Sequence, residues 1–264
     1  MTEKALAIEG LSFSRDGRSI LRDVSVAIGE GERWSIVGPN GAGKSSLLKC
    51  LVRIHTDWSG RVRLHGRPLE SYKQRELARM VAYVPQGGIQ GRFPYTTREF
   101  VEMARYPHVG PFGTRSPGDE KAVEDALARA GVRTLTDRIL ETLSGGERQK
   151  VSIAAALAQG GDLLLLDEPT AFLDYRQQSE VHNLLDTLHR ESGITIVTVT
   201  HDINAALRSD GNVMALRDGA VAYAGHVSGL VSGLRLEEVF GTRFIFLEDP
   251  ETGLRVVAPG GAVA

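Results

Sequence analysis

Cysteine, long apolar runs and an excess of charge of either sign are all missing from this sequence of 264 residues. A single cysteine, Cys50, excludes an intramolecular disulfide, and its apolar helical surroundings favour a buried structural role. The start of the chain lacks the charged-then-apolar layout of a secretory signal. The longest apolar runs, 153–158 and 163–166, are far shorter than the ~18 residues that a membrane helix needs. We therefore expect a chain that works in a reducing cytoplasm and does not cross a membrane.

The balance of charge gives no support to nucleic-acid binding through a basic surface. Lys and Arg number 31 and Asp and Glu number 33, which gives a formal net charge of −2. Without a basic excess there is no simple electrostatic argument for binding nucleic acid, and we expect no nucleic-acid partner. A hydrophobic content of 42% with 24% charged residues is ordinary globular composition. The length allows one large α/β domain or two small ones.

Short apolar runs separated by helical patterns predict an α/β fold. Alternation over 24–28, after a turn at Asp16-Gly17, predicts a β region near the N-terminus. Predominantly apolar runs of strand length are typical of strands buried on both faces of a sheet, and helical segments fall between them. These runs are 34–37, 81–84, 163–166 and 194–199.

The strand signal disappears between residues 87 and 160. Helices are predicted there over 97–105, 119–130 and 146–158. Strand patterns return at 212–216 and 220–223, joined by the hairpin signal Asp218-Gly219. The predicted organisation is an α/β core of 1–86 and 161–228, a helical insert of 87–160 and a C-terminal extension of 229–264.

The segment 38–45 carries the most specific chemistry. It matches G-x-x-x-x-G-K-[ST] without a mismatch, between a predicted strand and a predicted helix. In such a loop the backbone N–H groups wrap a phosphate, Lys44 adds charge at the β- and γ-phosphates, and the Ser45 hydroxyl binds Mg²⁺. A plain glycine turn would not need the lysine and the hydroxyl. The residues expected at the nucleotide are Gly38, Pro39, Asn40, Gly41, Ala42, Gly43, Lys44, Ser45 and Ser46.

The run 163–166 ends in two acids, Asp167 and Glu168. Alone, this pattern equally describes a strand that ends in a solvated acidic turn. Beside a P-loop, it predicts that Asp167 holds the Mg²⁺ shell and that Glu168 polarises the attacking water as a general base. Together the two segments predict hydrolysis of a nucleoside triphosphate.

A second anion site is predicted at 143–149. Ser144 and Glu147 have the spacing of a capping box for the following helix. A capping box does not require the two glycines that follow, Gly145 and Gly146. Adjacent glycines expose backbone N–H groups at a helix N-terminus, and such groups can bind an anion. One nucleotide does not need two such loops on one chain, so a second copy of the chain could use this one.

In their order along the chain, these segments resemble the nucleotide-binding subunit of ATP-binding cassette (ABC) transporters over roughly residues 4–228. The motifs that carry the resemblance are the Walker A segment 38–45, the Q-loop residue Gln86, the signature 143–149, the Walker B end 167–169, the D-loop 173–174 and the H-loop 201–202. The resemblance implies a P-loop NTPase core with a mixed sheet, an N-terminal antiparallel β subdomain and an inserted α-helical subdomain. It also implies ATP and Mg²⁺ as cofactors.

The resemblance implies roles for further residues. Two subunits would enclose two ATP molecules head to tail, each ATP held by Walker A of one copy and by Ser144, Gly145 and Gly146 of the other. Gln86 would sense Mg²⁺ and the attacking water and pass that state to a partner protein, and His201 would hydrogen-bond the γ-phosphate. Asp174 would act across the dimer; the alternative is an ordinary turn aspartate after Leu173.

Two positions depart from the family pattern. Arg15 stands where the family usually places an aromatic under the adenine, with Phe13 nearby. A guanidinium plane can still stack on a base, so Arg15 is kept as a nucleotide contact. Ala155 stands where the signature helix usually carries an arginine.

The segments 93–101, 103–108 and 173–178 resemble importers of ferric siderophores, haem and cobalamin. The same Thr96–Glu99 spacing is also a capping box on an amphipathic helix. The resemblance implies a peripheral subunit on the cytoplasmic face of the inner membrane, in two copies under two permease subunits fed by a substrate-binding protein. The alternatives are a soluble ABC-type ATPase for cluster assembly, repair or translation, and an ABC transporter for another substrate.

Overall fold

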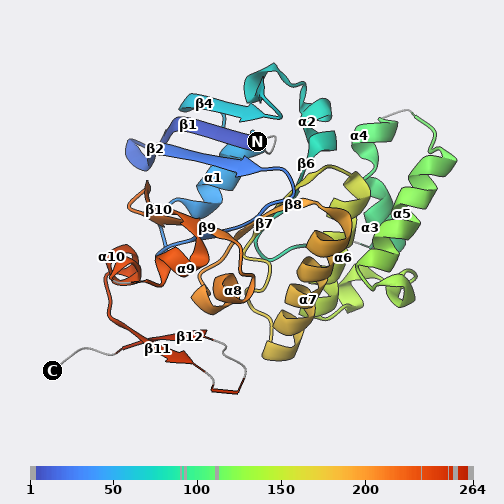
Figure 1. Ribbon diagram of the computed structural model, residues 1–264. Helices are drawn as coiled ribbons and strands as arrows, with labels where there is room; N and C mark the ends of the chain where they lie inside the picture. The colour runs from blue at the N-terminus through green and yellow to red at the C-terminus, as the bar shows by residue number, and fades with distance from the viewer. Residues whose placement is uncertain are drawn as a thin grey trace. The chain divides into compact units, whose positions relative to one another are not determined.

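The computed structural model describes residues 4–89, 91, 94–110, 113–232, 234–248, 250–251 and 255–260. Phe93, which begins one of the segments of importer resemblance, lies outside them. The chain forms two compact units. The first contains residues 1–69 and 197–264, and the second contains residues 70–196. Figure 1 labels their helices and strands.

An antiparallel sheet opens the first unit, with the strand order β2-β1-β4-β5 (blue to cyan in Figure 1). Asp16 and Gly17, with φ of 51° and 74°, form the tight turn between the first two strands, as predicted. Leu6 and Ile8 are buried because alternate residues of a strand share a face, and a register shift between Ile8 and Leu11 lets Leu11 be buried as well. The strands are β1 (Lys4–Arg15), β2 (Arg18–Gly29), β4 (Trp58–Leu64) and β5 (Arg67–Pro68).

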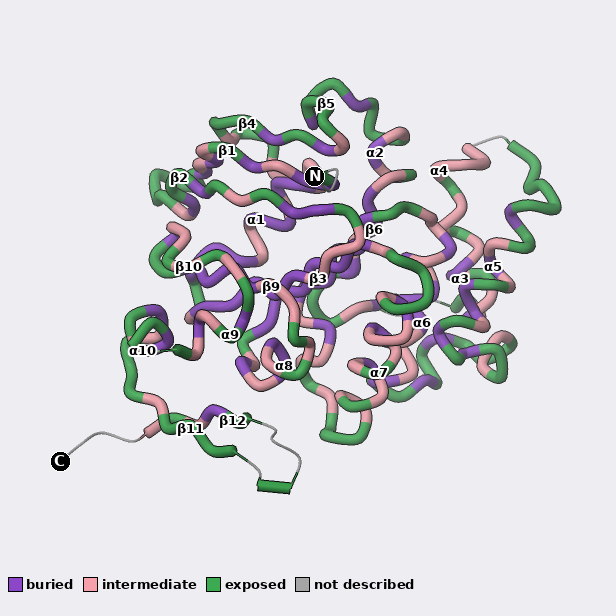
Figure 2. Tube along the Cα trace, in the orientation of Figure 1, coloured by how far each residue is buried: buried purple, intermediate pink, exposed green. Residues whose placement is uncertain are grey.

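A mixed sheet forms the centre of the first unit. Strand β3 (Arg33–Val37) runs parallel to β9 (Asn212–Arg217), and β10 (Ala220–His226) returns antiparallel to β9. The turn between β9 and β10 is the predicted Asp218-Gly219 hairpin, with φ of 49° and 81°. Figure 2 shows the burial of β3 and β9, which agrees with their apolar sequences. Helix α1 (Lys44–Leu51) follows β3 after the glycine loop.

The tail that was predicted as an extension contributes to the core of the first unit. Leu236 and Val239 belong to the same buried cluster as Val37 and Val213. A short hairpin is fastened to α8 by Asn204, whose side chain donates to the carbonyl of Val257 (3.0 Å) and accepts from its N–H (2.7 Å). The elements are α8 (Ile203–Arg208), α9 (Val227–Leu230), α10 (Arg235–Phe240), β11 (Phe244–Glu248) and β12 (Arg255–Pro259).

The second unit contains a parallel strand pair. Strand β6 (Val81–Val84) pairs with β7 (Leu163–Asp167), and every residue of β7 is buried. Helix α7 (Tyr175–Ser192) packs Val181 and Leu185 in the same cluster as Leu164 and Leu166. The chain passes from the second unit to the first within β8 (Thr195–Val199), and η1 (Leu69–Ser71) contains the other boundary.

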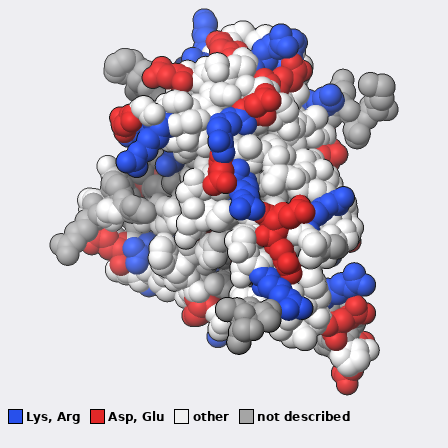
Figure 3. Space-filling model, turned by 90° about the vertical axis from the view of Figure 1, so that its left-hand side faces the viewer, with Lys and Arg blue, Asp and Glu red and all other residues white. Residues whose placement is uncertain are grey.

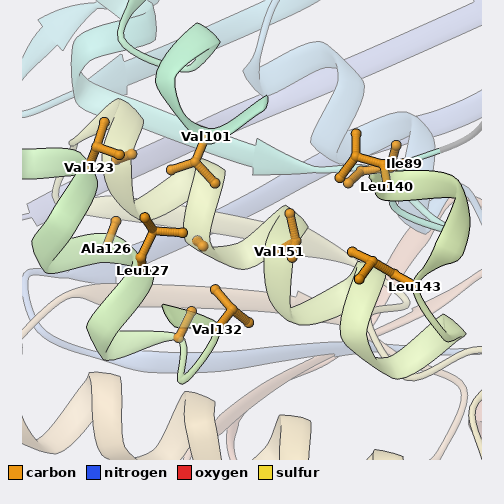
Figure 4. Close-up of a cluster of buried hydrophobic side chains, with 12 residues drawn as sticks. Ile89, Val101, Val123, Ala126, Leu127, Val132, Leu140, Leu143 and Val151 are labelled. Atoms are coloured by element: carbon orange, nitrogen blue, oxygen red, sulfur yellow. The ribbon is translucent and has the colours of Figure 1, made fainter. Parts of the chain in front are cut away.

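The remainder of the second unit is helical. Three helices enclose a buried apolar cluster in which Val101, Leu127 and Val151 meet (Figure 4). Capping boxes begin these helices at Thr96, Ser116 and Ser144. The helical elements outside α7 are α2 (Gln74–Met80), α3 (Thr97–Met103), α4 (Tyr106–Val109), α5 (Pro117–Arg129), η2 (Arg133–Leu135), η3 (Leu140–Thr142) and α6 (Gly145–Gln159).

The predicted fold class is confirmed: an α/β protein with a mixed sheet, an antiparallel N-terminal sheet and a helical insert. Two details of the insert differ from the prediction. The helix expected over 97–105 ends at Met103, and a separate short helix, α4, follows it with Pro107 in its first turn. Proline is tolerated there because the first turn of a helix has no partner for its N–H.

On the face seen in Figure 3, basic side chains lie among acidic ones, without a patch of one sign. Within the described ranges, no helix combines the length and the apolar character that a membrane crossing requires.

Candidate nucleotide site

The glycine loop between β3 and α1 has the backbone that a phosphate-binding loop needs. Gly38 has φ of 145°, and a Cβ on it would lie 2.1 Å from the carbonyl oxygen of Leu216 in β9. Gly43 has φ of 95° and its Cβ would lie 2.8 Å from the carbonyl oxygen of Ile20. Neighbouring backbone therefore leaves no room for a side chain at either end of the loop, and only glycine fits there. The loop leads directly into α1, whose first N–H groups are of the kind that bind a phosphate.

Lys44 lies over this loop. Its side chain is buried, and its Nζ donates to the carbonyl oxygens of Gly38 (2.8 Å) and Pro39 (2.9 Å). These bonds bring the ammonium to the first turn of the loop. A positive charge and a helix N-terminus are thus combined at one place, which is the arrangement that attracts a phosphate.

His201 belongs to the same unit as the loop. The N–H of Thr200 donates to the carbonyl oxygen of Ile36 (3.0 Å), so the end of β8 is attached next to the end of β3. Asp202 then caps α8 by accepting from the N–H of Asn204 (2.8 Å). His201, between these two fixed points, is exposed.

The acidic pair stands at the end of β7 in the second unit, where Asp167 is the last residue of the strand and Glu168 follows it. Asp167 is 2% exposed, and the hydroxyl of Tyr83 donates to its Oδ2 (3.3 Å). Burial, followed by the charge of Asp167, raises the pKa of Tyr83. Tyr83 was not predicted as a site residue. The sequence signal for it is its position on the run 81–84, which pairs in parallel with the strand that ends at Asp167.

Glu168 is joined to the predicted Q-loop residue. The amide nitrogen of Gln86 donates to Oε2 of Glu168 (2.8 Å), although the two residues are 82 positions apart. Glu168 also has a left-handed backbone, with φ of 48°. Such a conformation is uncommon outside glycine, asparagine and aspartate, and it often accompanies a functional site. The structure therefore brings together two of the three residues predicted as catalytic.

The signature segment begins α6 as predicted. Ser144 caps the helix and forms the capping box with Glu147, whose pKa is lowered mainly by the hydrogen bond from the N–H of Ser144 (2.7 Å). Leu143 is buried in the helical cluster, as Figure 4 shows. Ser144 and Gly145 are exposed. The N-terminus of α6 is thus anchored by an apolar residue, and Ser144 and Gly145 beside it are accessible to solvent.

Asp174 of the predicted D-loop lies close to the signature. It caps α7 by accepting from the N–H of Gln177 (2.8 Å). A Cβ on Gly146 would lie 2.8 Å from the Gln177 side chain, and one on Gly145 would lie 3.5 Å from Leu173. The start of α7 therefore packs against the start of α6, so the predicted signature and D-loop residues form one surface.

Arg15, the predicted contact to the adenine, is the last residue of β1. Its side chain is 64% exposed and lies 3.8 Å from the carboxylate of Asp16. Phe13 is buried and stacks on His55, with ring centroids 4.7 Å apart and planes 13° apart. Phe13 is therefore committed to an internal contact, and only Arg15 of this pair presents a flat group to solvent.

The predicted site residues divide between the two units. The loop 38–46, Arg15 and His201 belong to the first unit, whereas Gln86, Asp167, Glu168, Asp174 and the signature belong to the second. Among the described residues, no cluster of three or more His, Cys, Asp or Glu side chains could hold a metal ion. A P-loop magnesium site does not require one, because it takes a serine hydroxyl and one carboxylate.

A glycine loop that caps a helix, a buried strand that ends in two acids, and a second glycine pair at a helix N-terminus together define a P-loop nucleotide-binding protein. Residues 21–171 match the family described as ABC transporter. The chain belongs to this family of ATP-binding, ATP-hydrolysing proteins.

Similar proteins cover nearly the whole chain. The ferric enterobactin transport ATP-binding protein FepC of Escherichia coli is 36% identical over 100% of this chain and 98% of its own length. The hemin import ATP-binding protein HmuV of Streptomyces coelicolor is 40% identical over 97% of this chain and 90% of its own. A cobalamin import ATP-binding protein, BtuD of Halobacterium salinarum, is 37% identical over 96% of this chain and 63% of its own.

Solved structures share the fold. A putative metal-chelate type ABC transporter in an inward-facing conformation matches with a TM-score of 0.84 and 27% identity, covering 97% of both chains. The ATP-binding cassette MJ0796, solved as a dimer bound to ADP and Pi, matches with a TM-score of 0.71 and 28% identity over 84% of this chain and 98% of its own.

Proposed function

We propose that this chain is the ATP-hydrolysing subunit of an importer that takes up an iron chelate, haem or cobalamin. The supporting observation is similarity over nearly the full length to subunits named for import of ferric enterobactin, hemin and cobalamin. ATP hydrolysis would supply the energy for transport, so the subunit is a translocase ATPase.

Phosphate binding would rest on the loop 38–46. The N–H groups at the start of α1 and the ammonium of Lys44 would bind the β- and γ-phosphates. Mg²⁺, when bound, neutralises charge on these phosphates. Ser45, Gln86 and Asp167 are proposed to hold it, and their oxygen donors suit this hard cation.

Hydrolysis would use Glu168 as the general base. Its carboxylate accepts a hydrogen bond from Gln86 (2.8 Å), which fixes the orientation of the base and connects it to the Q-loop. His201 would hydrogen-bond the γ-phosphate. Because Gln86 contacts Glu168 directly, a movement of the Q-loop would shift the carboxylate of this general base. The contact would in this way couple a partner protein to ATP hydrolysis.

The signature is proposed to bind the ATP of a second copy. Ser144 and Gly145 are exposed at the N-terminus of α6, where the helix would favour an anion, and the chain already has one such loop in its P-loop. A head-to-tail homodimer with two ATP molecules would use both. The dimeric MJ0796 structure supports this arrangement, since it is a related cassette bound to ADP and Pi.

The permease is proposed to dock beside the Q-loop. A pocket of about 320 Å³ lies in the second unit between β6 and the helices α3 and α6. Phe100, Met103 and Ala155 line it, and Ala155 leaves room there because its side chain is a single methyl group. Two permease subunits would seat on two such pockets, and a substrate-binding protein would deliver the cargo. The ATPase would then be peripheral on the cytoplasmic face of the inner membrane.

The test is capture of the chain from gently solubilised membranes, with mass spectrometry of what co-purifies. We expect one polytopic membrane protein, and ATPase activity of the purified complex that rises when its binding protein and a ferric chelate, haem or cobalamin are added. Met103→Glu should abolish capture by placing a charge in the pocket. Ile54→Glu, at a residue that is 58% exposed in the first unit, is the matched control. Recovery with soluble partners alone would favour the soluble ATPase instead.

A further inference from the structure

Tyr83 on β6 reaches the acidic end of the neighbouring strand. In the parallel register of β6 and β7 it lies level with Leu165, and Asp167 stands two residues further along β7. Alternate residues of a strand share a face, so these three residues lie on one side of the strand pair. Their neighbours Val84 and Leu166 belong to the apolar cluster with α7 on the other side. The hydroxyl of Tyr83 donates across the strands to Oδ2 of Asp167 (3.3 Å).

This hydrogen bond is made to a carboxylate that is 2% exposed. A buried carboxylate is stabilised as an anion by donors that replace the lost water. A phenol is such a donor and carries no charge of its own at neutral pH. It therefore orients the carboxylate without cancelling the negative charge that attracts a cation. Donors of this kind, beyond the ligands themselves, fix the orientation of metal-binding side chains.

Tyr83 also borders the pocket of about 320 Å³ beside the Q-loop. It lines this pocket together with Phe100 and Met103 of α3 and Ala155 of α6. One side chain thus lines the pocket and holds Asp167 through its hydroxyl. A group seated in the pocket contacts Tyr83, and a tilt of the Tyr83 ring moves the hydroxyl that holds the carboxylate.

We propose that Tyr83 is a positioning residue for Asp167 and that it makes Mg²⁺ binding depend on what occupies the pocket. This inference rests on the proposed function, in which Asp167 holds Mg²⁺ and the permease docks in the pocket. The hydroxyl keeps the Asp167 carboxylate in one orientation, and an occupant that tilts the ring changes that orientation. A partner protein in this way acts on cation binding as well as on the base Glu168.

The test measures how far Mg²⁺ strengthens nucleotide binding by the full chain. ADP is the probe because it is not hydrolysed, and direct titration gives its dissociation constants with EDTA and with saturating Mg²⁺. Tyr83→Phe removes only the hydroxyl and should lower the ratio of these two constants about 10-fold, since loss of a partner of a metal-binding residue typically costs 10–100-fold in metal affinity. The constant with EDTA should stay unchanged, because Lys44 and the loop 38–46 are untouched.

Two further variants make the result specific, and thermal melting without nucleotide checks that each variant is folded. Asp167→Asn should lower the ratio at least as far as Tyr83→Phe. Tyr106→Phe removes a hydroxyl from a residue that is 58% exposed and should leave the ratio unchanged. An unchanged ratio in Tyr83→Phe, with a lowered ratio in Asp167→Asn, would overturn the role of Tyr83 alone. An unchanged ratio in Asp167→Asn would overturn the Mg²⁺ site of the proposed function, and the role of Tyr83 with it.

A substitution in the pocket tests the link to an occupant. Ala155→Leu fills part of the pocket from α6 and should change the ratio at least ~3-fold, which is within the range of couplings through a shared cavity. In the Tyr83→Phe variant it should have no effect on the ratio, because the hydroxyl that transmits the tilt is gone. The same change in both backgrounds, or no change in the wild type, would overturn the link to the pocket while leaving the positioning of Asp167 intact.

Discussion

Asp119, in the first turn of α5, is expected to be a major source of stability in the helical part of the second unit. Its Oδ1 accepts two hydrogen bonds from Arg105 (2.9 and 2.8 Å), and its Oδ2 accepts two from Ser116 (2.9 and 2.7 Å). Arg105 also donates to the carbonyl oxygen of Ala158 at the end of α6 (2.7 Å). One carboxylate therefore ties α5 to the segment after α3 and, through the guanidinium, to α6.

The loss of unfolding free energy on removing this carboxylate can be estimated from the burial of the ion pair. The side chains of Arg105 and Asp119 are 12% and 9% exposed, so Asp119→Ala would leave a nearly buried guanidinium with donors unpaired. Breaking a buried pair from one side costs about 3–5 kcal/mol. We expect the low end, about 3 kcal/mol, because Arg105 keeps its bond to Ala158. For a protein of this size this is a fall in melting temperature of roughly 6–12 °C.

The effect should depend on pH. Hydrogen bonds from Ser116, and then from Arg105, hold the pKa of the Asp119 carboxyl well below its ordinary value. A depressed pKa in the folded state means that the unfolded chain binds the proton more tightly. The stabilisation is therefore complete above the unfolded pKa of about 3.9 and is lost as the pH falls below it.

Melting curves of the wild type, Asp119→Ala and Asp119→Asn at several pH values test this. The expected difference is largest at pH 7, smaller for the asparagine variant, and shrinks below about pH 4. Asp125→Asn, at an exposed position of the same helix, is the matched control. Equal melting temperatures of wild type and Asp119→Ala at pH 7, or a difference that persists unchanged into strong acid, would refute the reasoning.

Three predictions concern the nucleotide. Lys44→Ala should weaken ATP binding at least ~10-fold in direct titration, because hydrogen bonds to charged groups contribute about 1.5–3 kcal/mol each; unchanged affinity would contradict the P-loop assignment. Glu168→Gln should lower turnover about 10²–10⁴-fold while ATP binding persists, since only the base is lost; undiminished hydrolysis would remove Glu168 from that role. Arg15→Tyr should tighten ATP binding about 10-fold in direct titration if the ring stacks on the base; an unchanged ATP affinity would place Arg15 outside the base site.

Features with local causes could be predicted from the sequence. The turn at Asp16-Gly17, the hairpin at Asp218-Gly219 and the capping box at Ser144 each depend on residues within a few positions of one another. The order of motifs then indicated the family, and with it the helical insert and the mixed sheet. The roles of the individual site residues are still predictions.

Features that depend on distant residues could not be predicted. The contact of Gln86 with Glu168 joins positions 82 apart, and the attachment of Asn204 to Val257 spans 53. Spacing within the sequence carries no signal for such pairs. The exposure of Phe172 was also unpredictable, because an apolar residue before a leucine reads as core until the backbone is known.

The side chain of Asn204 gives the C-terminal hairpin an unusual means of attachment. Its amide bonds both the N–H and the carbonyl of Val257, as one residue of a neighbouring strand would, while β11 is the strand partner of β12. The helix that carries it begins two residues after His201. The hairpin is therefore attached directly to the helix that follows the H-loop. A spectroscopic label on the exposed Glu251 would report displacement of that helix from a position remote in sequence, without altering any residue predicted to touch nucleotide.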